Sequence, residues 1–239
     1  MSWTLTHHII YIDNPVGTGF SFTKLDKCFA KNQDNVATDL YVALLQFFVT
    51  FPHLRKNDFY ITGESYAGKY VPAITHKIHT LNPKAQQKIN LKGMAIGDGL
   101  CDPETMTDYG DFLFTIGLID ELDRDYYKKV EAIMVKMIKA KQWNSAFRIF
   151  DDLLNGDMSK RPSYFSNSTG FNYYFNYLLT KEPEDHGYYH KLIEQAPIRK
   201  ALHVGNKTFN DGSKVEQMLL QDIMQSVKPW IEDIMENYK

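Results

Sequence analysis

Residues 59–70 read Phe-Tyr-Ile-Thr-Gly-Glu-Ser-Tyr-Ala-Gly-Lys-Tyr. The first four are aromatic or β-branched, which is typical of a strand, whereas Tyr70, Ile74 and Ile78 recur at helical spacing. The stretch therefore predicts a strand, a sharp turn around Ser65 and a helix. A serine in such a turn is lifted out of the sheet edge and directed at the positive N-terminal end of the helix.

The residues around this turn are small where the backbone has to bend. Gly63 permits the tight turn, and Ala67 with Gly68 lets helix and strand approach closely. Ser65 becomes a candidate nucleophile, and the Tyr66 N–H a candidate oxyanion donor. The common hydrolase pattern Gly-x-Ser-x-Gly is met here in modified form, with Ala67 at the second glycine. The alternative is a serine that only caps the helix.

Outward from the turn, strand and helix patterns alternate. Residues 9–12, Ile-Ile-Tyr-Ile, predict a buried strand that ends in a glycine-bearing loop, and residues 91–96 predict another strand. An amphipathic helix is expected from Asp34, its N-cap, to a stop at Pro52. Three strands alternating with two helices predict a parallel sheet with crossover helices, so the fold class is α/β.

The alternation of strand and helix patterns stops after residue 105, and helical patterns follow. Three parts are expected: a core at 1–105, a helical and loop insertion at 106–200, and a return segment with a C-terminal helix at 201–239. The last helix is predicted over residues 215–238, ended or kinked by Pro229. Residues 161–189, rich in Ser, Asn, Tyr and Phe, predict irregular loops packed by aromatic side chains. The insertion shows two helical patterns, marked by Val130, Ile133, Met134, Met137 and Ile138, and by Ala146, Phe147, Phe150, Leu153 and Leu154.

Composition and charge exclude several classes. The chain has 27 Lys+Arg against 29 Asp+Glu, a net charge of -2, and no basic run, which argues against a nucleic-acid partner. No apolar run reaches the ~18–20 residues of a membrane span. The N-terminus has no basic start followed by an apolar core, so we expect no secretory signal in this chain.

Two further features concern covalent chemistry. Cys28 and Cys101 lie far apart without metal-type spacing and could pair or stay free, so no metal site is predicted. Asn167-Ser168-Thr169 and Asn206-Lys207-Thr208 are acceptor sequons, which makes Asn167 and Asn206 candidate N-glycosylation sites if the chain enters the secretory pathway.

Three motifs in consistent order resemble the serine carboxypeptidase family. They are Gly-Glu-Ser-Tyr-Ala-Gly at 63–68 followed by Tyr-Val-Pro at 70–72, Asp-Asn-Pro-Val-Gly-Thr-Gly-Phe-Ser at 13–21, and Gly-Asp-Gly at 97–99. The similarity continues through Tyr-Gly at 109–110, Gly-Leu-Ile at 117–119 and Ala-Leu-His-Val-Gly at 201–205, and so covers essentially the whole chain.

The resemblance implies an incomplete α/β-hydrolase sheet with a helical cap, a lysosomal or secreted setting, no cofactor, and removal of C-terminal residues from peptide substrates at acidic pH. It makes Ser65 the nucleophile and Tyr66 the source of an oxyanion amide. Glu64 becomes the carboxyl group that holds the C-terminal carboxylate of the substrate, which works best when the two groups share a proton. The alternative for Glu64 is a solvated side chain at a helix start.

The chain also departs from the family. An α/β-hydrolase supplies an aspartate and a histidine after the serine in chain order, and we expect both to be missing here. His76 and His79 lie on the helix that leaves Ser65, with His76 roughly 16 Å along its axis. His186, His190 and His203 do not resemble the family's C-terminal Gly-His-x-x-Pro segment, and Asp98 and Asp102 are no substitutes for the acid.

The family's Trp-x-Asn-Gly-Gly-Pro-Gly segment, which resemblance places before Trp3, is not found either. We therefore expect negligible peptidase activity from this chain alone. Two alternatives stay open: an inactive form that acts by binding, and a family acyltransferase that uses the same serine.

Overall fold

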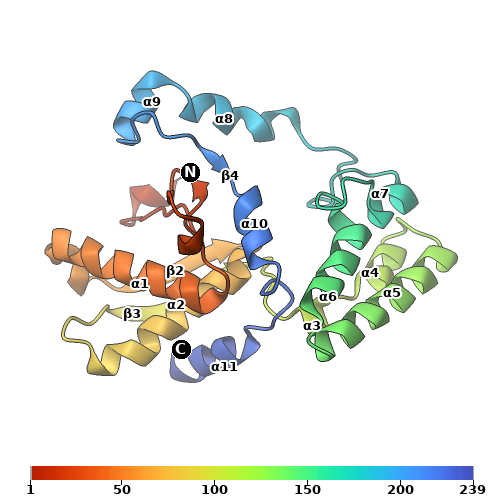
Figure 1. The fold of residues 1–239 in the computed structure, drawn as a ribbon, viewed down its shortest axis with the longest axis horizontal. Helices are drawn as coiled ribbons and strands as arrows, with labels where there is room; N and C mark the ends of the chain where they lie inside the picture. Colours follow the sequence, from red (N-terminus) through yellow and green to blue (C-terminus); the bar gives the residue numbers. More distant parts are fainter. Residues whose placement is uncertain (1, 239) are drawn as a thin grey trace.

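A computed structural model describes residues 2–238. Figure 1 shows a small sheet with its two helices on one side of the molecule and a bundle of helices on the other. The blue segments α8 to α10 lead from the bundle back to the sheet side, and α11 lies beneath it.

The sheet is built from two parallel strands and a crossover helix. β2 (Phe59–Glu64) pairs with β3 (Leu91–Gly97), from Phe59 opposite Leu91 to Glu64 opposite Gly97. α2 (Ala67–Leu81) connects them, followed by a 3-10 turn at Asn82–Lys84, and α1 (Gln33–Thr50) packs beside α2. The predicted α/β class is confirmed. The core under this sheet is formed by Leu44, Phe48, Ile74, Ile78, Ile89 and Leu91.

The predicted strand at residues 9–12 is wrong. This segment belongs to no strand, and Ile10, Tyr11 and Ile12 are exposed. Within the described residues its backbone makes no backbone hydrogen bonds, because no neighbouring strand lies beside it. An apolar β-branched run can indicate strand propensity, but pairing decides whether the strand forms.

The boundaries of α1 were predicted in part. Its N-cap is Asn32, whose side-chain oxygen accepts from the Asn35 N–H at 2.9 Å, and not Asp34. Asp34 lies in the first turn, where a negative charge is favourable, and pairs with Lys77 at 2.8 Å. The predicted stop holds, because α1 ends at Thr50 and Pro52 starts the 3-10 turn Pro52–Lys56.

The insertion forms the bundle on the other side. The bundle contains α4 (Tyr109–Thr115), α5 (Glu121–Lys139), α6 (Trp143–Phe150) and α7 (Tyr164–Thr169), and α3 (Pro103–Met106), which begins before the predicted insertion, packs against α5. Both predicted helical patterns are confirmed, although a π-helical turn, Asp151–Asn155, continues the second. The bundle core holds Leu113, Ile119, Tyr127, Leu153, Leu154 and Phe165.

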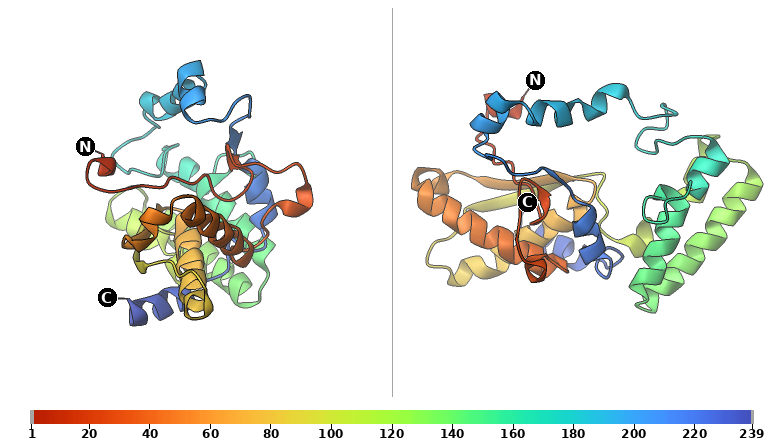
Figure 2. Two further views of the ribbon diagram at one scale, coloured as in Figure 1. Left: turned by 90° about the vertical axis from the view of Figure 1, so that its left-hand side faces the viewer. Right: turned by 45° about the horizontal axis from the view of Figure 1, so that its top comes forward.

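Beyond α7 the chain crosses back as an arch. It carries a 3-10 turn (Glu184–Gly187), α8 (Tyr188–Ile193) and α9 (Ala196–Ala201), and both views of Figure 2 show it standing above the sheet. The arch ends in β4 (Asn210–Asp211), which pairs antiparallel with β1 (Thr18–Gly19). Two further 3-10 turns, Trp3–Leu5 and Asp26–Cys28, lie near the start of the chain.

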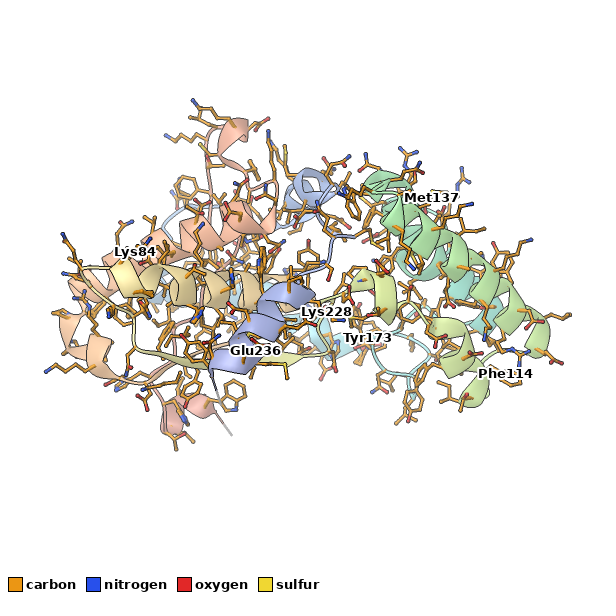
Figure 3. The ribbon with its side chains drawn as sticks, turned by 90° about the horizontal axis from the view of Figure 1, so that it is seen from below. Lys84, Phe114, Met137, Tyr173, Lys228 and Glu236 are labelled. Carbon is orange, nitrogen blue, oxygen red and sulfur yellow. The ribbon has the colours of Figure 1, made fainter. Side chains whose placement is uncertain are left out.

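The single C-terminal helix predicted over residues 215–238 is two helices. α10 (Ser213–Leu219) and α11 (Lys228–Asn237) are separated by residues 220–227. Pro229 is the second residue of α11 and does not end a helix, since a proline in the first turn loses no intrahelical hydrogen bond. Figure 3 shows α11, marked by Lys228 and Glu236, lying across the sheet-side helices. None of the helices among residues 2–238 combines the length and apolarity of a bilayer span.

Candidate active site

Ser65 sits in a strained turn between β2 and α2. Its φ of 59° lies in the left-handed region, which is uncommon for a residue with a side chain. Three backbone hydrogen bonds hold it there: the Ser65 N–H donates to the Gly97 carbonyl at 2.9 Å, and its carbonyl accepts from Gly68 and Leu100 at 3.0 Å. Such strain costs of order 1–3 kcal/mol and persists only where the surroundings enforce it.

The small residues around the turn are required by close packing. A Cβ on Gly63 would lie 2.5 Å from the Ala67 Cβ, so the methyl group of Ala67 occupies the space that Gly63 leaves free. A Cβ on Gly68 would lie 2.6 Å from the Leu100 nitrogen, and one on Gly99 would lie 2.9 Å from the Gly68 Cα. The alanine in the modified motif is therefore accommodated, and the loop after β3 packs directly on the serine turn.

The three predicted site residues differ in exposure. Glu64 and Ser65 are exposed, and the Glu64 stem lies beside Gly97, with its Cγ 3.6 Å from where a Cβ would be. The Tyr66 ring is half-buried, packs against Tyr70 at 5.0 Å and reaches the core that contains Leu219. Burial raises the pKa of both tyrosines, so their hydroxyls stay protonated at neutral pH. Tyr66 thus anchors the turn and leaves its N–H at the helix start.

A buried lysine lies one helical turn beyond Ser65. Lys69 is fully buried, and its ammonium donates to the Gln225 carbonyl. Burial lowers the pKa of Lys69 to about 8, opposed in part by the charge of Asp222. Asp222 is itself buried and accepts from Gln33 Nε2 at 2.7 Å, and burial raises its pKa. Our sequence reasoning missed this cluster, because no short-range pattern links α2 to residues 222–225.

The motif at residues 13–21 folds into a compact loop. Asp13 Oδ2 accepts from the Phe20 N–H at 2.8 Å, and the Gly17 N–H donates to the Ser21 carbonyl at 3.0 Å. Gly19 has a φ of 56°, and a Cβ there would lie 2.4 Å from the Asp13 carboxyl carbon. The Asn14–Pro15 peptide bond is cis. The glycines of this motif are therefore explained by the shape of the loop.

Ser65 lines a cavity of about 1020 Å³. Glu64, Ser65 and Tyr66 line one end, and the same cavity runs along β2 and residues 6–10. Its floor is apolar and comes from α1 and α2, including Leu44, Phe47 and Phe48. Within the described part of the chain, β2 pairs on one edge only, with β3. A substrate carbonyl could reach Ser65 from this side.

The described residues bring no base to Ser65. Among residues 2–238 its hydroxyl makes no hydrogen bond, and Asp98, although next to the turn with a φ of 44°, is not bonded to it. His76 and His79 face α11, and His186 contacts Tyr173. His7 and His8 line the cavity, but His7 Nδ1 pairs with Thr6 at 2.8 Å.

No metal cluster of three His, Cys, Asp or Glu side chains occurs in the part of the chain that the structure describes. Cys28 is exposed and Cys101 half-buried, and both are free thiols.

Comparison with known families explains the motifs together. The family model described as serine carboxypeptidase matches residues 1–239. The chain belongs to the serine carboxypeptidase family. A probable serine carboxypeptidase, CPVL of Homo sapiens, is 55% identical over 238 residues, 99% of this chain. Venom serine carboxypeptidase of Apis mellifera is 50% identical over 240 residues, 100% of this chain.

This family member spans about half the length of the curated relatives it matches, 50% of the human protein and 51% of the bee protein. Among solved structures, Kex1Δp, a prohormone-processing carboxypeptidase from Saccharomyces cerevisiae, matches with a TM-score of 0.66 at 21% identity. That match covers 95% of this chain and 53% of the yeast chain. At this identity it supports the fold: an incomplete α/β-hydrolase sheet with a helical insertion.

Proposed function

We propose that Ser65 is the nucleophile of a serine-type carboxypeptidase site that removes C-terminal residues from peptides. The observation that carries this proposal is the strained φ of Ser65 in a strand–turn–helix that opens into the cavity. A serine that only capped α2 would not need this conformation, and the structure records no side-chain cap at the start of α2.

In the proposed reaction the Ser65 hydroxyl oxygen attacks the carbonyl carbon of the last peptide bond. The carbonyl oxygen becomes negatively charged, and the Tyr66 N–H, at the positive end of α2, stabilises that charge. The Ser65 proton passes to a base and then to the departing amine, and water afterwards releases the acyl group from the serine.

Glu64 is proposed to bind the free carboxylate of the substrate. It follows directly on β2, is exposed, and lines the same end of the cavity as Ser65. A carboxyl group can hold a carboxylate only by sharing a proton with it, because two negative charges repel. This pairing favours acidic conditions and a substrate with an unblocked C-terminus.

For the 239-residue chain alone we propose negligible peptidase turnover. The Ser65 hydroxyl has no hydrogen-bonded base within residues 2–238, and loss of such a base typically costs about six orders of magnitude in rate. The same observation favours a second function, peptide binding without cleavage.

The setting is proposed to be lysosomal or secreted, in line with the family. Asn167 on α7 and Asn206 after α9 are exposed, as an acceptor of an N-linked glycan must be. We propose both as glycosylation sites. Expression in a secreting cell, followed by enzymatic removal of N-glycans, should lower the apparent mass, and Asn167→Gln with Asn206→Gln should abolish that change.

A fluorophosphonate probe tests Ser65 directly. We expect weak or no labelling of the 239-residue chain, and strong labelling of a form extended to the length of its relatives that disappears in Ser65→Ala. Ser168→Ala, a change at another hydroxyl, serves as the matched control. Strong labelling that persists in Ser65→Ala would contradict the assignment of the nucleophile.

Substrate recognition is tested with two peptides that differ only at the C-terminus, a free carboxylate or an amide. Binding to the 239-residue chain should favour the carboxylate at acidic pH, and Glu64→Ala should remove that preference. Equal binding of both peptides by the unmodified chain would overturn the role of Glu64.

A further inference from the structure

Two histidines on α2 meet one carboxylate on α11. His76 Nε2 lies 3.4 Å from Asp233 Oδ2, and His79 Nε2 lies 3.7 Å from the same oxygen. The other carboxylate oxygen, Oδ1, accepts from Asn237 Nδ2 at 3.3 Å. Asp233 is thus oriented by its own helix and presents a single oxygen to two imidazoles.

The two imidazoles have different surroundings. His79 Nδ1 lies 3.1 Å from the Tyr238 hydroxyl, so a protonated His79 can donate to Tyr238 and to Asp233 at once. His76 stacks on Trp230 with ring centroids 5.7 Å apart, and the structure shows Asp233 as its sole charged partner among the described residues. Burial lowers the pKa of His76, reinforced by His79 and Lys77 and opposed by Asp233.

The contacts around this cluster are those that hold α11. Ile234, the buried residue of α11, follows Asp233 directly, and Tyr238, which also comes after Asp233, packs on the core beneath the sheet. Of the other charged groups nearby, Lys77 on α2 is paired with Asp34 of α1, and Lys228 with Glu232 within α11. The charge interactions between α2 and α11 therefore come from His76, His79 and Asp233.

We propose that this interface is a pH-sensitive latch, in which α11 is held most firmly on α2 when the two imidazoles carry one proton between them and is loosened when both are protonated. With neutral imidazoles the three groups carry one negative charge. One proton neutralises the cluster, and a second leaves two positively charged imidazoles that share one carboxylate oxygen and repel each other. Because the first proton disfavours the second, the second step falls at lower pH than the first.

The latch acts on the helix that begins at the candidate nucleophile. α2 starts two residues after Ser65, and the segment that leads into α11 is tied to the same helix by Lys69 and Gln225, and to the loop after β3 by the Val227 N–H and the Cys101 carbonyl at 2.9 Å. Acidification would free the far end of α11 while these ties keep its near end in place. The inference does not depend on the proposed peptidase function.

Amide hydrogen exchange of residues 228–238 in the full chain between pH 5 and pH 8, corrected for intrinsic exchange, tests the latch. Protection should pass through a maximum between the two protonation steps and fall by about fivefold toward pH 5, the scale of one partly exposed charge interaction. His76→Asn should remove the acid-side loss, because it removes the second proton. Asp233→Asn should remove the maximum of protection, because no carboxylate is then present to attract the first protonated imidazole.

His203→Asn is the matched control, since His203 is exposed on another segment with a φ of 56° that asparagine tolerates. It should keep the profile of the unmodified chain. Titration of the histidine ring protons by NMR gives a second readout that survives poor expression of any one variant. Identical exchange profiles in the unmodified chain and Asp233→Asn, or titration of His76 unchanged by Asp233→Asn, would overturn the latch.

Discussion

At the scale of single residues, Lys69 combines full burial with a charge. Its ammonium group has the Gln225 carbonyl as its hydrogen-bond partner, while Asp222 supplies charge compensation from farther away. Burying a cation with so few partners costs free energy, which is why its pKa falls to about 8. Above that pH the folded chain holds a neutral amine and the cost disappears.

This gives a signed prediction for the dependence of stability on pH. Between pH 8 and the ordinary lysine value of about 10.4, the unfolded chain binds a proton that the folded chain does not, so the free energy of unfolding rises with pH. The rise should approach about 3 kcal/mol, because the pKa of Lys69 is lower in the folded chain than in the unfolded chain and each pKa unit corresponds to about 1.4 kcal/mol. Tyr66, Tyr70 and Cys101 act in the opposite direction at high pH, because burial raises their pKa values.

The measurement is therefore a difference between two variants. Urea unfolding of the unmodified chain and of Lys69→Met, at pH 7 and at pH 9.5, cancels the tyrosine and cysteine contributions. Relative to Lys69→Met, the unmodified chain should gain stability at pH 9.5. A difference that stays constant with pH would mean that Lys69 is solvated in solution.

At the scale of elements, two substitutions distinguish Asn32 from Asp34 as the N-cap of α1. Asn32→Ala should cost about 1 kcal/mol, because it removes the oxygen that the Asn35 N–H bonds. Asp34→Ala should cost about 0.5 kcal/mol, since Asp34 contributes only a first-turn charge and an exposed pair with Lys77. Thermal unfolding of both variants checks the order, and the reverse order would restore Asp34 as the cap.

The comparison of sequence with structure differs from element to element for a physical reason. The strand, turn and helix around Ser65 were predictable, because periodicity and small residues act within a few positions of the turn. The break between α10 and α11 was not, because residues 220–227 are held by contacts with Lys69 and Cys101, which are remote in sequence. The strand expected at residues 9–12 failed for the same reason, since strand pairing is also non-local.

The same division holds at the candidate site. Ser65, Tyr66 and Glu64 were found from a local motif, and their catalytic roles stay predictions. The cluster of Lys69 and Asp222 and the arrangement of His76 and His79 around Asp233 required tertiary structure. His76 and His79 lie on α2 too far from Ser65 to act as its base, and no sequence pattern indicates Asp233 of α11 as their partner.

At the scale of the whole molecule, the sheet is open beside the candidate site. β2 has one unpaired edge within the described residues, and the cavity beside it has an apolar floor from α1 and α2. Unpaired backbone groups beside an apolar surface favour pairing with another chain. The arrangement that exposes Ser65 therefore also exposes the sheet.

We expect this edge to cause self-association that a single charge reduces. Tyr60 is 61% exposed on β2, so Tyr60→Lys places a charge on the strand at little cost to packing, as natural edge strands do. Tyr177→Lys is the matched control, because Tyr177 is 54% exposed in the insertion and the change in charge and aromatic surface is the same. Sedimentation velocity over a concentration series should show less association for Tyr60→Lys and no change for Tyr177→Lys. If both variants associate like the unmodified chain, the contact lies elsewhere, and the unpaired edge of β2 is protected in solution; if both are equally reduced, net charge and not the sheet edge controls association.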